Sequence, residues 1–278
     1  MIDQILFFEH IKNYPFLARL GFFILTLLLF WLPFAIPIYY FLGDKDPNLT
    51  TIITMAILFV IFLFLVKFWG KYVNNNNKIF SYYGLVNSKK NWQYLIKGLL
   101  IGFISNWVLF YVEALFGWLN FHPSTIAFPQ LILEGFISAI GIGFAEELFF
   151  RGWLLSELET DFSLGISAGL NSFLFAVAHF IKPLAEVIRT MVTFPALLLL
   201  GYTLISAKRS HQNLLGINIG IHSGLVWGYY VVNVGEMITY TETVPPWITG
   251  IDKNPIAGIM GLTFLSLLLL TIKIEKKR

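Results

Sequence analysis

The stretch that decides the fold runs from Leu131 to Phe150 and has the sequence LILEGFISAIGIGFAEELFF. Its length matches the roughly 20 apolar residues that a helix needs to cross a bilayer. Two adjacent carboxylates, Glu146 and Glu147, stand near its end. Apolar runs of similar length lie on both sides of it, so the sequence predicts an all-α fold, a polytopic bundle of about eight transmembrane helices.

The composition supports this class. Of 278 residues, 57% are hydrophobic and 13% are charged, whereas roughly 25% charged residues are usual in soluble domains. The apolar excess must therefore face lipid. High hydrophobicity excludes intrinsic disorder, and the absence of cysteine excludes disulfides and thiolate catalysis. A net charge of +3 is too small to indicate a nucleic acid partner.

Apolar length between charges and turn clusters places the predicted spans at 20–42, 50–66, 98–119, 131–150, 164–180, 191–207, 214–234 and 255–272. Cytoplasmic loops retain Lys and Arg, and the connection between the second and third spans holds six lysines without an acidic residue. We therefore expect this loop and both termini, including the basic tail Lys273–Arg278, to be cytoplasmic. The expected membrane is the plasma membrane or, in a photosynthetic source, the thylakoid.

Charged or titratable side chains inside a span are costly and mark functional sites. The strongest cases here are Glu146, Glu147, Arg151, His179 and His222, whereas Glu113 and Glu134 are weaker cases that we expect near the outer surface. Glu147 and Arg151 have the i, i+4 spacing that lets a guanidinium bind a carboxylate on a helix. Such a pair is more often a structural clamp than a catalytic one. Glu146 points about 100° away on the helical wheel, which leaves its carboxylate free to act as a general base.

Each histidine follows a polar or aromatic residue by one helical turn, Phe175 before His179 and Asn218 before His222, so each pair shares a face. Glu146 and the two imidazoles on three helices can activate water in two ways. Either Glu146 is the base and the imidazoles assist, or all three bind a divalent metal such as zinc. The residues leave both open.

Close helix approach is expected at small residues, namely Gly141, Gly143, Gly165, Ala168, Gly169, Ala176, Ala178, Gly220 and Gly224. The acidic residues Glu157, Glu159 and Asp161 are predicted to be a solvated loop.

The three ordered motifs are Glu146-Glu147-x-x-x-Arg151, Phe175-x-x-x-His179 and His222 in a Gly-rich apolar helix. They resemble those of the CPBP family, the CAAX protease and bacteriocin-processing (Abi) group of intramembrane glutamic-type endopeptidases. The resemblance covers about 129–234. It implies that Glu146 activates water, that His179 assists, that His222 helps to form the oxyanion hole, and that Glu147 and Arg151 support the site.

One position departs from the family pattern. Many members carry Asn four residues after the third-motif His, where its amide stabilises the oxyanion, and this chain has Val226 there. Losing one oxyanion donor costs about 10²–10³-fold in turnover. We expect either Asn218 or Ser223 to compensate, or the chain to be a weak or non-proteolytic member.

Three functions follow from these expectations. The leading one is an intramembrane endopeptidase that cleaves a membrane-protein or lipidated peptide substrate with a Glu-activated water. The alternative is a non-catalytic scaffold or assembly factor within a larger membrane complex, in which His179 or His222 ligates a pigment. A transporter with a protonatable Glu comes third. The chain divides into N-terminal helices with the basic loop (1–128), the core helices (129–234) and a C-terminal loop with the last helix (235–278).

Overall fold

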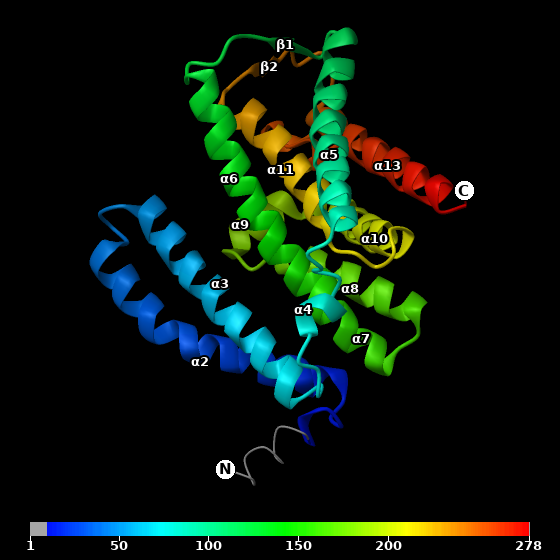
Figure 1. Cartoon of the computed structure of the whole chain (residues 1–278). Helices are drawn as coiled ribbons and strands as arrows, with labels where there is room; N and C mark the ends of the chain where they lie inside the picture. Colours follow the sequence, from blue (N-terminus) through cyan, green and yellow to red (C-terminus); the bar gives the residue numbers. More distant parts are fainter. Residues whose placement is uncertain (1–9, 278) are drawn as a thin grey trace. The chain divides into compact units, whose positions relative to one another are not determined.

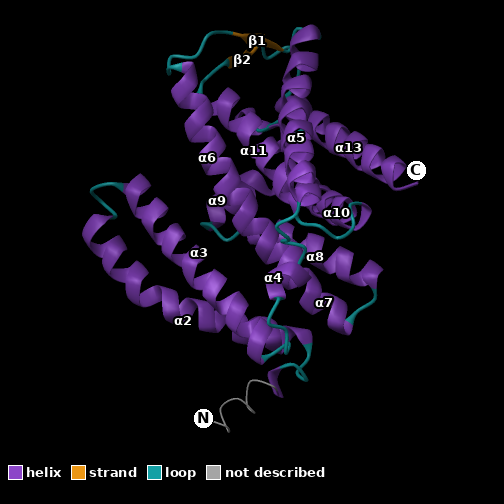
Figure 2. Cartoon of the chain, in the orientation of Figure 1, coloured by secondary structure: helices purple, strands orange, loops and turns teal. Residues whose placement is uncertain are grey.

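The computed structural model describes residues 10–277, so Arg278 of the predicted cytoplasmic tail lies outside the described residues. The chain forms two compact units. One holds the residues up to Tyr82 together with Glu157–Asp161, and the other holds Tyr83–Ser156 and the chain from Phe162 onward. Helices dominate both (Figure 2), as the sequence predicted.

The first unit is built on a helical hairpin. Helix α2 (Phe16–Leu42) packs along α3 (Pro47–Tyr72), and the short α4 (Ile79–Tyr82) follows (Figure 1). Asp46 caps α3, since its side chain accepts a hydrogen bond from the backbone N–H of Leu49 at 2.9 Å. The ring of Phe23 packs edge-on against Trp69 with centroids 5.3 Å apart.

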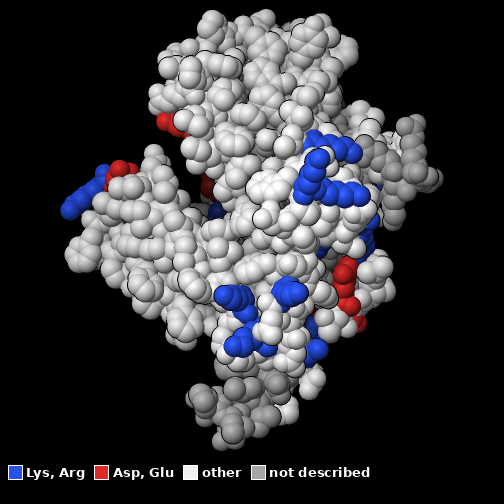
Figure 3. Space-filling model, viewed as in Figure 1, with Lys and Arg blue, Asp and Glu red and all other residues white. Residues whose placement is uncertain are grey.

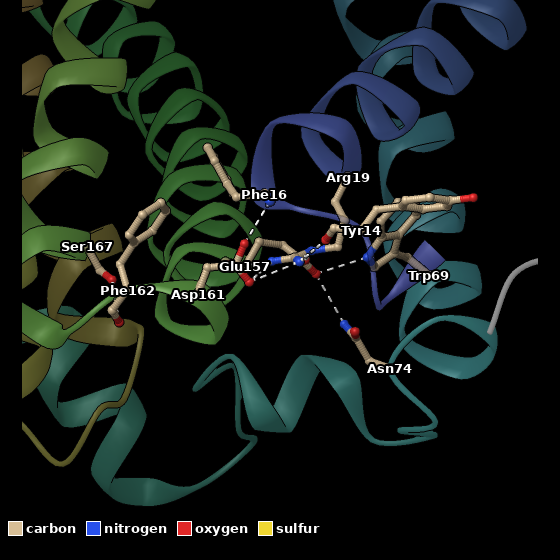
Figure 4. Close-up of polar contacts among 9 residues, drawn as sticks. All are labelled: Tyr14, Phe16, Arg19, Trp69, Asn74, Glu157, Asp161, Phe162 and Ser167. Carbon is tan, nitrogen blue, oxygen red and sulfur yellow. Dashed lines mark hydrogen bonds and ion pairs between the residues drawn. The ribbon is translucent and has the colours of Figure 1, made fainter. Parts of the chain in front are cut away.

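This unit contains an ion cluster around the buried Arg19 (Figure 4). Arg19 is 2% exposed and makes five hydrogen bonds, to both Glu157 and Asp161 and to the carbonyl of Tyr14. A guanidinium has five N–H donors, so all of them are used. We call Arg19, Glu157 and Asp161 the Arg19 cluster.

The prediction of a solvated acidic loop was therefore wrong for Glu157, which is buried. Asp161 is exposed, as predicted, although it ends a helix and pairs with Arg19. Both lie on α7 (Leu155–Asp161), and Glu157 is 3% exposed because its charge is paired with a cation far earlier in the chain. Glu159 between them is exposed, as predicted.

The second unit contains α5 (Lys89–Leu115), α6 (Phe128–Glu147), α8 (Leu164–Ala178), α9 (Leu184–Thr190), α10 (Phe194–Ser210), α11 (Gly216–Val234), α12 (Pro246–Thr249) and α13 (Ile259–Lys277). Most of α11 is buried, and it packs mainly against α5 and α6, while α8 and α13 pack against α10. A Cβ at Gly102 of α5 would lie 2.3 Å from the carbonyl oxygen of Ile221, and one at Gly224 of α11 would lie 2.3 Å from that of Leu99. Glycine on both helices therefore brings the backbones of α5 and α11 into contact.

Helix α6 approaches α11 in the same way. A Cβ at Gly143 would lie 2.2 Å from Oγ of Ser223, so the expectation of close approach is confirmed at Gly143, as it is at Gly220 and Gly224. It was wrong at Gly141, Gly165 and Gly169, where an added Cβ would meet nothing within 4 Å. These glycines are in helices, but a side chain at these positions would not meet another helix.

A small antiparallel ribbon is the exception to the all-α prediction. Strand β1 (Leu119–Phe121) pairs with β2 (Ile238–Tyr240), with Asn120 opposite Thr239. Burial raises the pKa of Tyr240, so its phenol stays neutral and donates a hydrogen bond to Glu113 Oε2 at 3.1 Å. Short 3₁₀ turns at Met191–Thr193, Ile251–Lys253 and Pro255–Ala257 complete the connections.

Five helical stretches of the described residues are long and apolar enough to cross a membrane, namely Phe16–Leu42, Pro47–Tyr72, Lys89–Leu115, Phe128–Asp161 and Leu184–Ser210. The protein is thus a multi-pass integral membrane protein, and much of the surface in Figure 3 is free of charged side chains. Helix α8 has 15 residues, and α11 is buried rather than lipid-facing. The count of eight spans and the placement of the termini stay predictions.

Candidate active site

Glu146 and Glu147 end α6, and the chain continues as a π-helical turn, Leu148–Leu154. Such wide turns are rare and are frequently found at functional sites. Two side chains satisfy backbone groups of this turn. Asn171 of α8 donates to the Phe150 carbonyl at 2.7 Å, and Lys208 of α10 donates to the Arg151 carbonyl at 2.6 Å. Neighbouring helices therefore hold the turn that carries Arg151.

Glu147 is fully buried, with 0% exposure. Its Oε1 accepts one hydrogen bond from Arg151 Nη1 at 2.9 Å and another from Nδ1 of His222 at 2.8 Å. Because a carboxylate oxygen accepts, Nδ1 of His222 carries the proton. Glu147 therefore fixes both the orientation of the imidazole and its proton position, while Arg151 supplies the balancing positive charge.

Glu146 has a different environment from its neighbour. Its side chain is 32% exposed, and Oε2 lies 3.9 Å from Nε2 of His222, which is longer than a hydrogen bond. Within residues 10–277, this oxygen has no hydrogen-bond partner. The sequence predicted that one of the two carboxylates would not be bound by Arg151. In the structure this carboxylate is Glu146, whose Oε2 lies beside Nε2 of His222.

His179 is placed at the end of α8 and is oriented by its own helix. Its Nδ1 donates to the carbonyl of Phe175 at 2.8 Å. The ring of Phe175 contacts three groups of the site: its centroid lies 4.7 Å from that of His179, 6.1 Å from that of His222 and 4.2 Å from Cζ of Arg151. Phe175 therefore packs against both imidazoles and stacks against the guanidinium.

Both histidines line a cavity of about 200 Å³. Its walls come from α5, α8, α10, α11 and the segment from Asn254 to α13, and they are mainly apolar. The polar residues in the lining, besides the histidines, are Ser105, Asn106, Tyr229 and Asn254. The cavity thus offers an apolar space beside the imidazoles with few polar groups.

The structure does not gather every predicted residue. In the described part of the chain, no three His, Asp or Glu side chains are close enough to hold a metal ion, so Glu146, His179 and His222 do not form the donor set that zinc would need. Asn218 donates to the Leu204 carbonyl at 2.7 Å, and Ser223 faces Gly143. Neither lines the cavity, so the expectation that one of them replaces the missing amide has no support here.

Sequence reasoning missed three polar residues at this site. Asn171 and Lys208 hold the π-helical turn, and Asn106 lines the cavity. Asn106 and Asn171 stand within predicted apolar spans, so the rule applied to charged residues, extended to amides, would have found them.

The chain was compared with protein families, curated proteins and solved structures. No curated protein and no solved structure matches the chain. Residues 128–235 match the family model described as type II CAAX prenyl endopeptidase Rce1-like. This range includes the acidic end of α6 and all of α8, α10 and α11. The motifs that the sequence placed in the CPBP family thus belong to an Rce1-like domain, of the CAAX prenyl endopeptidase family, that this chain contains over residues 128–235.

Proposed function

We propose that the protein is an intramembrane endopeptidase that hydrolyses a peptide bond with a water activated by Glu146. The observation that carries this proposal is the contrast between the two carboxylates. Glu147 is fully buried and bound to Arg151 and His222. Oε2 of Glu146 has no hydrogen-bond partner among the described residues and faces Nε2 of His222 at 3.9 Å.

The proposed reaction uses the space between these two groups. Glu146 takes a proton from water, the water oxygen bonds to the carbonyl carbon of the substrate, and the carbonyl oxygen gains the negative charge. The C–N bond then breaks, and the leaving nitrogen receives the proton from Glu146. His222, held through Nδ1 by Glu147, keeps its Nε2 directed at the reaction space. His179 lines the same cavity as His222, and in this proposal it assists the reaction.

The substrate class follows from the surroundings of the site. The cavity lining is mainly apolar, and the helices that carry it belong to a membrane protein. An extended peptide joined to a membrane segment or to a lipid fits such a space, because its apolar part gains burial. We therefore propose a membrane-protein or lipidated peptide substrate.

The test is hydrolysis of quenched peptides by the purified protein in detergent. General-base catalysis contributes about 10²–10⁴-fold, so Glu146→Ala should lower kcat by at least about 10²-fold. Glu134 lies on the same helix, is exposed and pairs only with Gln130 among the described contacts, so Glu134→Gln is the matched control and should keep full activity.

Equal cleavage by the wild type and Glu146→Ala would exclude this role of Glu146. Activity that survives a chelator but is lost in His179→Ala would support the metal-free form of the reaction.

A scaffold function is the second candidate, because Val226 leaves an apolar side chain in the cavity next to His222. In that case the protein should co-purify with a partner membrane protein, and the function should survive Glu146→Gln.

A further inference from the structure

Asn106 is a buried amide beside the candidate site. It lies on α5, before the first residue of the matched domain, and is 7% exposed. It lines the same cavity as His179, His222 and Val226. An asparagine in an apolar helix is costly unless its polar atoms are used. Among the described residues, Oδ1 of Asn106 has no hydrogen-bond partner and Nδ2 has one.

The contacts of Asn106 fix the direction of its amide. Nδ2 donates to the carbonyl of Leu225 at 2.7 Å, and a carbonyl oxygen only accepts, so the nitrogen and not the oxygen faces α11. This bond uses one of the two N–H groups on Nδ2. Gly228 makes the approach possible, since a Cβ there would lie 2.9 Å from Cβ of Asn106.

The amide of Asn106 contacts α11 close to His222 and Val226. Leu225, Val226 and Gly228 belong to the helical turn that follows His222, and His222, Leu225 and Val226 line the cavity together. Asn106 therefore places an N–H group alongside the turn that presents Val226. Asn218 and Ser223, the amide and hydroxyl of α11 itself, lie outside this lining.

We propose that the second N–H of Asn106 Nδ2 donates to the oxyanion that forms when water attacks the substrate carbonyl. The inference rests on the proposed peptidase function and adds a catalytic residue from outside the matched domain. A donor aimed at the oxyanion acts mainly on the transition state. Removing one such donor lowers kcat by about 10²–10³-fold.

Kinetics of variants give the first test. Asn106→Ala should lower kcat by about 10²-fold with little change in KM. Gln93 is an exposed amide on the same helix, so Gln93→Ala is the matched control and should keep full activity. Adding Val226→Asn to Asn106→Ala should recover at least about tenfold of the loss, because it supplies an amide from the adjacent turn. Full kcat in Asn106→Ala, or no recovery in the double variant, would limit Asn106 to packing.

A binding measurement separates this inference from the proposed function. The probe is a phosphinic analogue of the quenched peptide, whose tetrahedral P–O⁻ group resembles the oxyanion, and the comparison is the unmodified peptide. Asn106→Ala should weaken binding of the phosphinic analogue by about 10- to 100-fold and leave binding of the unmodified peptide unchanged.

Failure of the peptidase function and failure of the Asn106 assignment give different results. If the wild type cleaves nothing but Asn106→Ala still weakens the phosphinic analogue selectively, the amide assignment holds and the peptidase function fails. Equal affinity of both proteins for the analogue, with unchanged thermal unfolding, would overturn the assignment.

Discussion

The molecule contains two clusters in which a buried arginine has two acidic neighbours, one cluster in each unit, and they differ in how completely their polar atoms are used. In the Arg19 cluster, all five N–H groups of the arginine are bonded, and Trp69 adds a bond to Glu157 at 2.9 Å. Around Arg151, polar atoms of the described residues stay without partners: Oε2 of Glu146, Oε2 of Glu147 and Nε of Arg151.

We interpret this difference as one between a structural cluster and the proposed catalytic site. A fully satisfied polar network rigidifies a fold, whereas unsatisfied buried polar atoms are costly and call for an explanation. Both clusters are strongly held by an arginine, so an ion pair alone does not identify the site. A carboxylate oxygen without a partner beside a histidine distinguishes the candidate site. We therefore propose a catalytic role for Glu146 and a structural role for Arg19.

The largest expected effect is at Arg151. Replacing it by Met leaves Glu147 buried without a counter-ion, which costs about 3–5 kcal/mol of unfolding free energy. Because Glu147 also orients His222, the folded fraction should lose hydrolytic activity as well. Thermal unfolding in detergent and peptide hydrolysis measure the two effects, and retention of both would contradict the assigned role of the pair.

Arg19→Met should cause a similar loss of stability, about 3–5 kcal/mol, because it leaves Glu157 and Asp161 without their cation. The kcat of the folded protein should stay at the wild-type value. The exposed pair of Arg189 and Glu186 provides the control, and Arg189→Met should not change unfolding measurably. Loss of kcat at unchanged stability in Arg19→Met would reverse the comparison.

Helix contact at the site gives a smaller effect. Gly143→Ala should cost about 1–3 kcal/mol, typical of overpacking, because the new Cβ meets Ser223 and moves α6 away from α11. Activity should fall with it, since these helices carry Glu147 and His222. Gly141→Ala on the same helix meets nothing within 4 Å and should be neutral or stabilising. Identical behaviour of the two variants would argue against this packing.

The last comparison concerns two residues at the edge of the Arg19 cluster, and the smallest effect is expected at Asn74. Trp69→Phe removes a hydrogen bond to a charged group and should cost about 1.5–3 kcal/mol. Asn74 donates to the same carboxylate at 3.3 Å, a longer bond, and Asn74→Ala should cost under about 1 kcal/mol. Chemical denaturation measures both, and the opposite order would mean that Asn74 rather than Trp69 secures Glu157.

Sequence reasoning reached the membrane class and the family resemblance, and it proposed candidate site residues, because apolar length and charged residues within a span are local features. It did not reach the partner of Glu157, since Arg19 lies 138 positions earlier and no local pattern links them. It also missed the π-helical turn at Leu148–Leu154, which depends on donors from other helices. Asn106 was missed because its proposed role depends on which turn of α11 it contacts, and the sequence does not show that contact.

The most direct test of the central claim is hydrolysis in H₂¹⁸O, followed by mass spectrometry of the products. The account predicts that the wild type releases a peptide whose new carboxyl group carries one ¹⁸O atom, and that Glu146→Gln forms no such product within the same time. Equal ¹⁸O incorporation by the two proteins would contradict it.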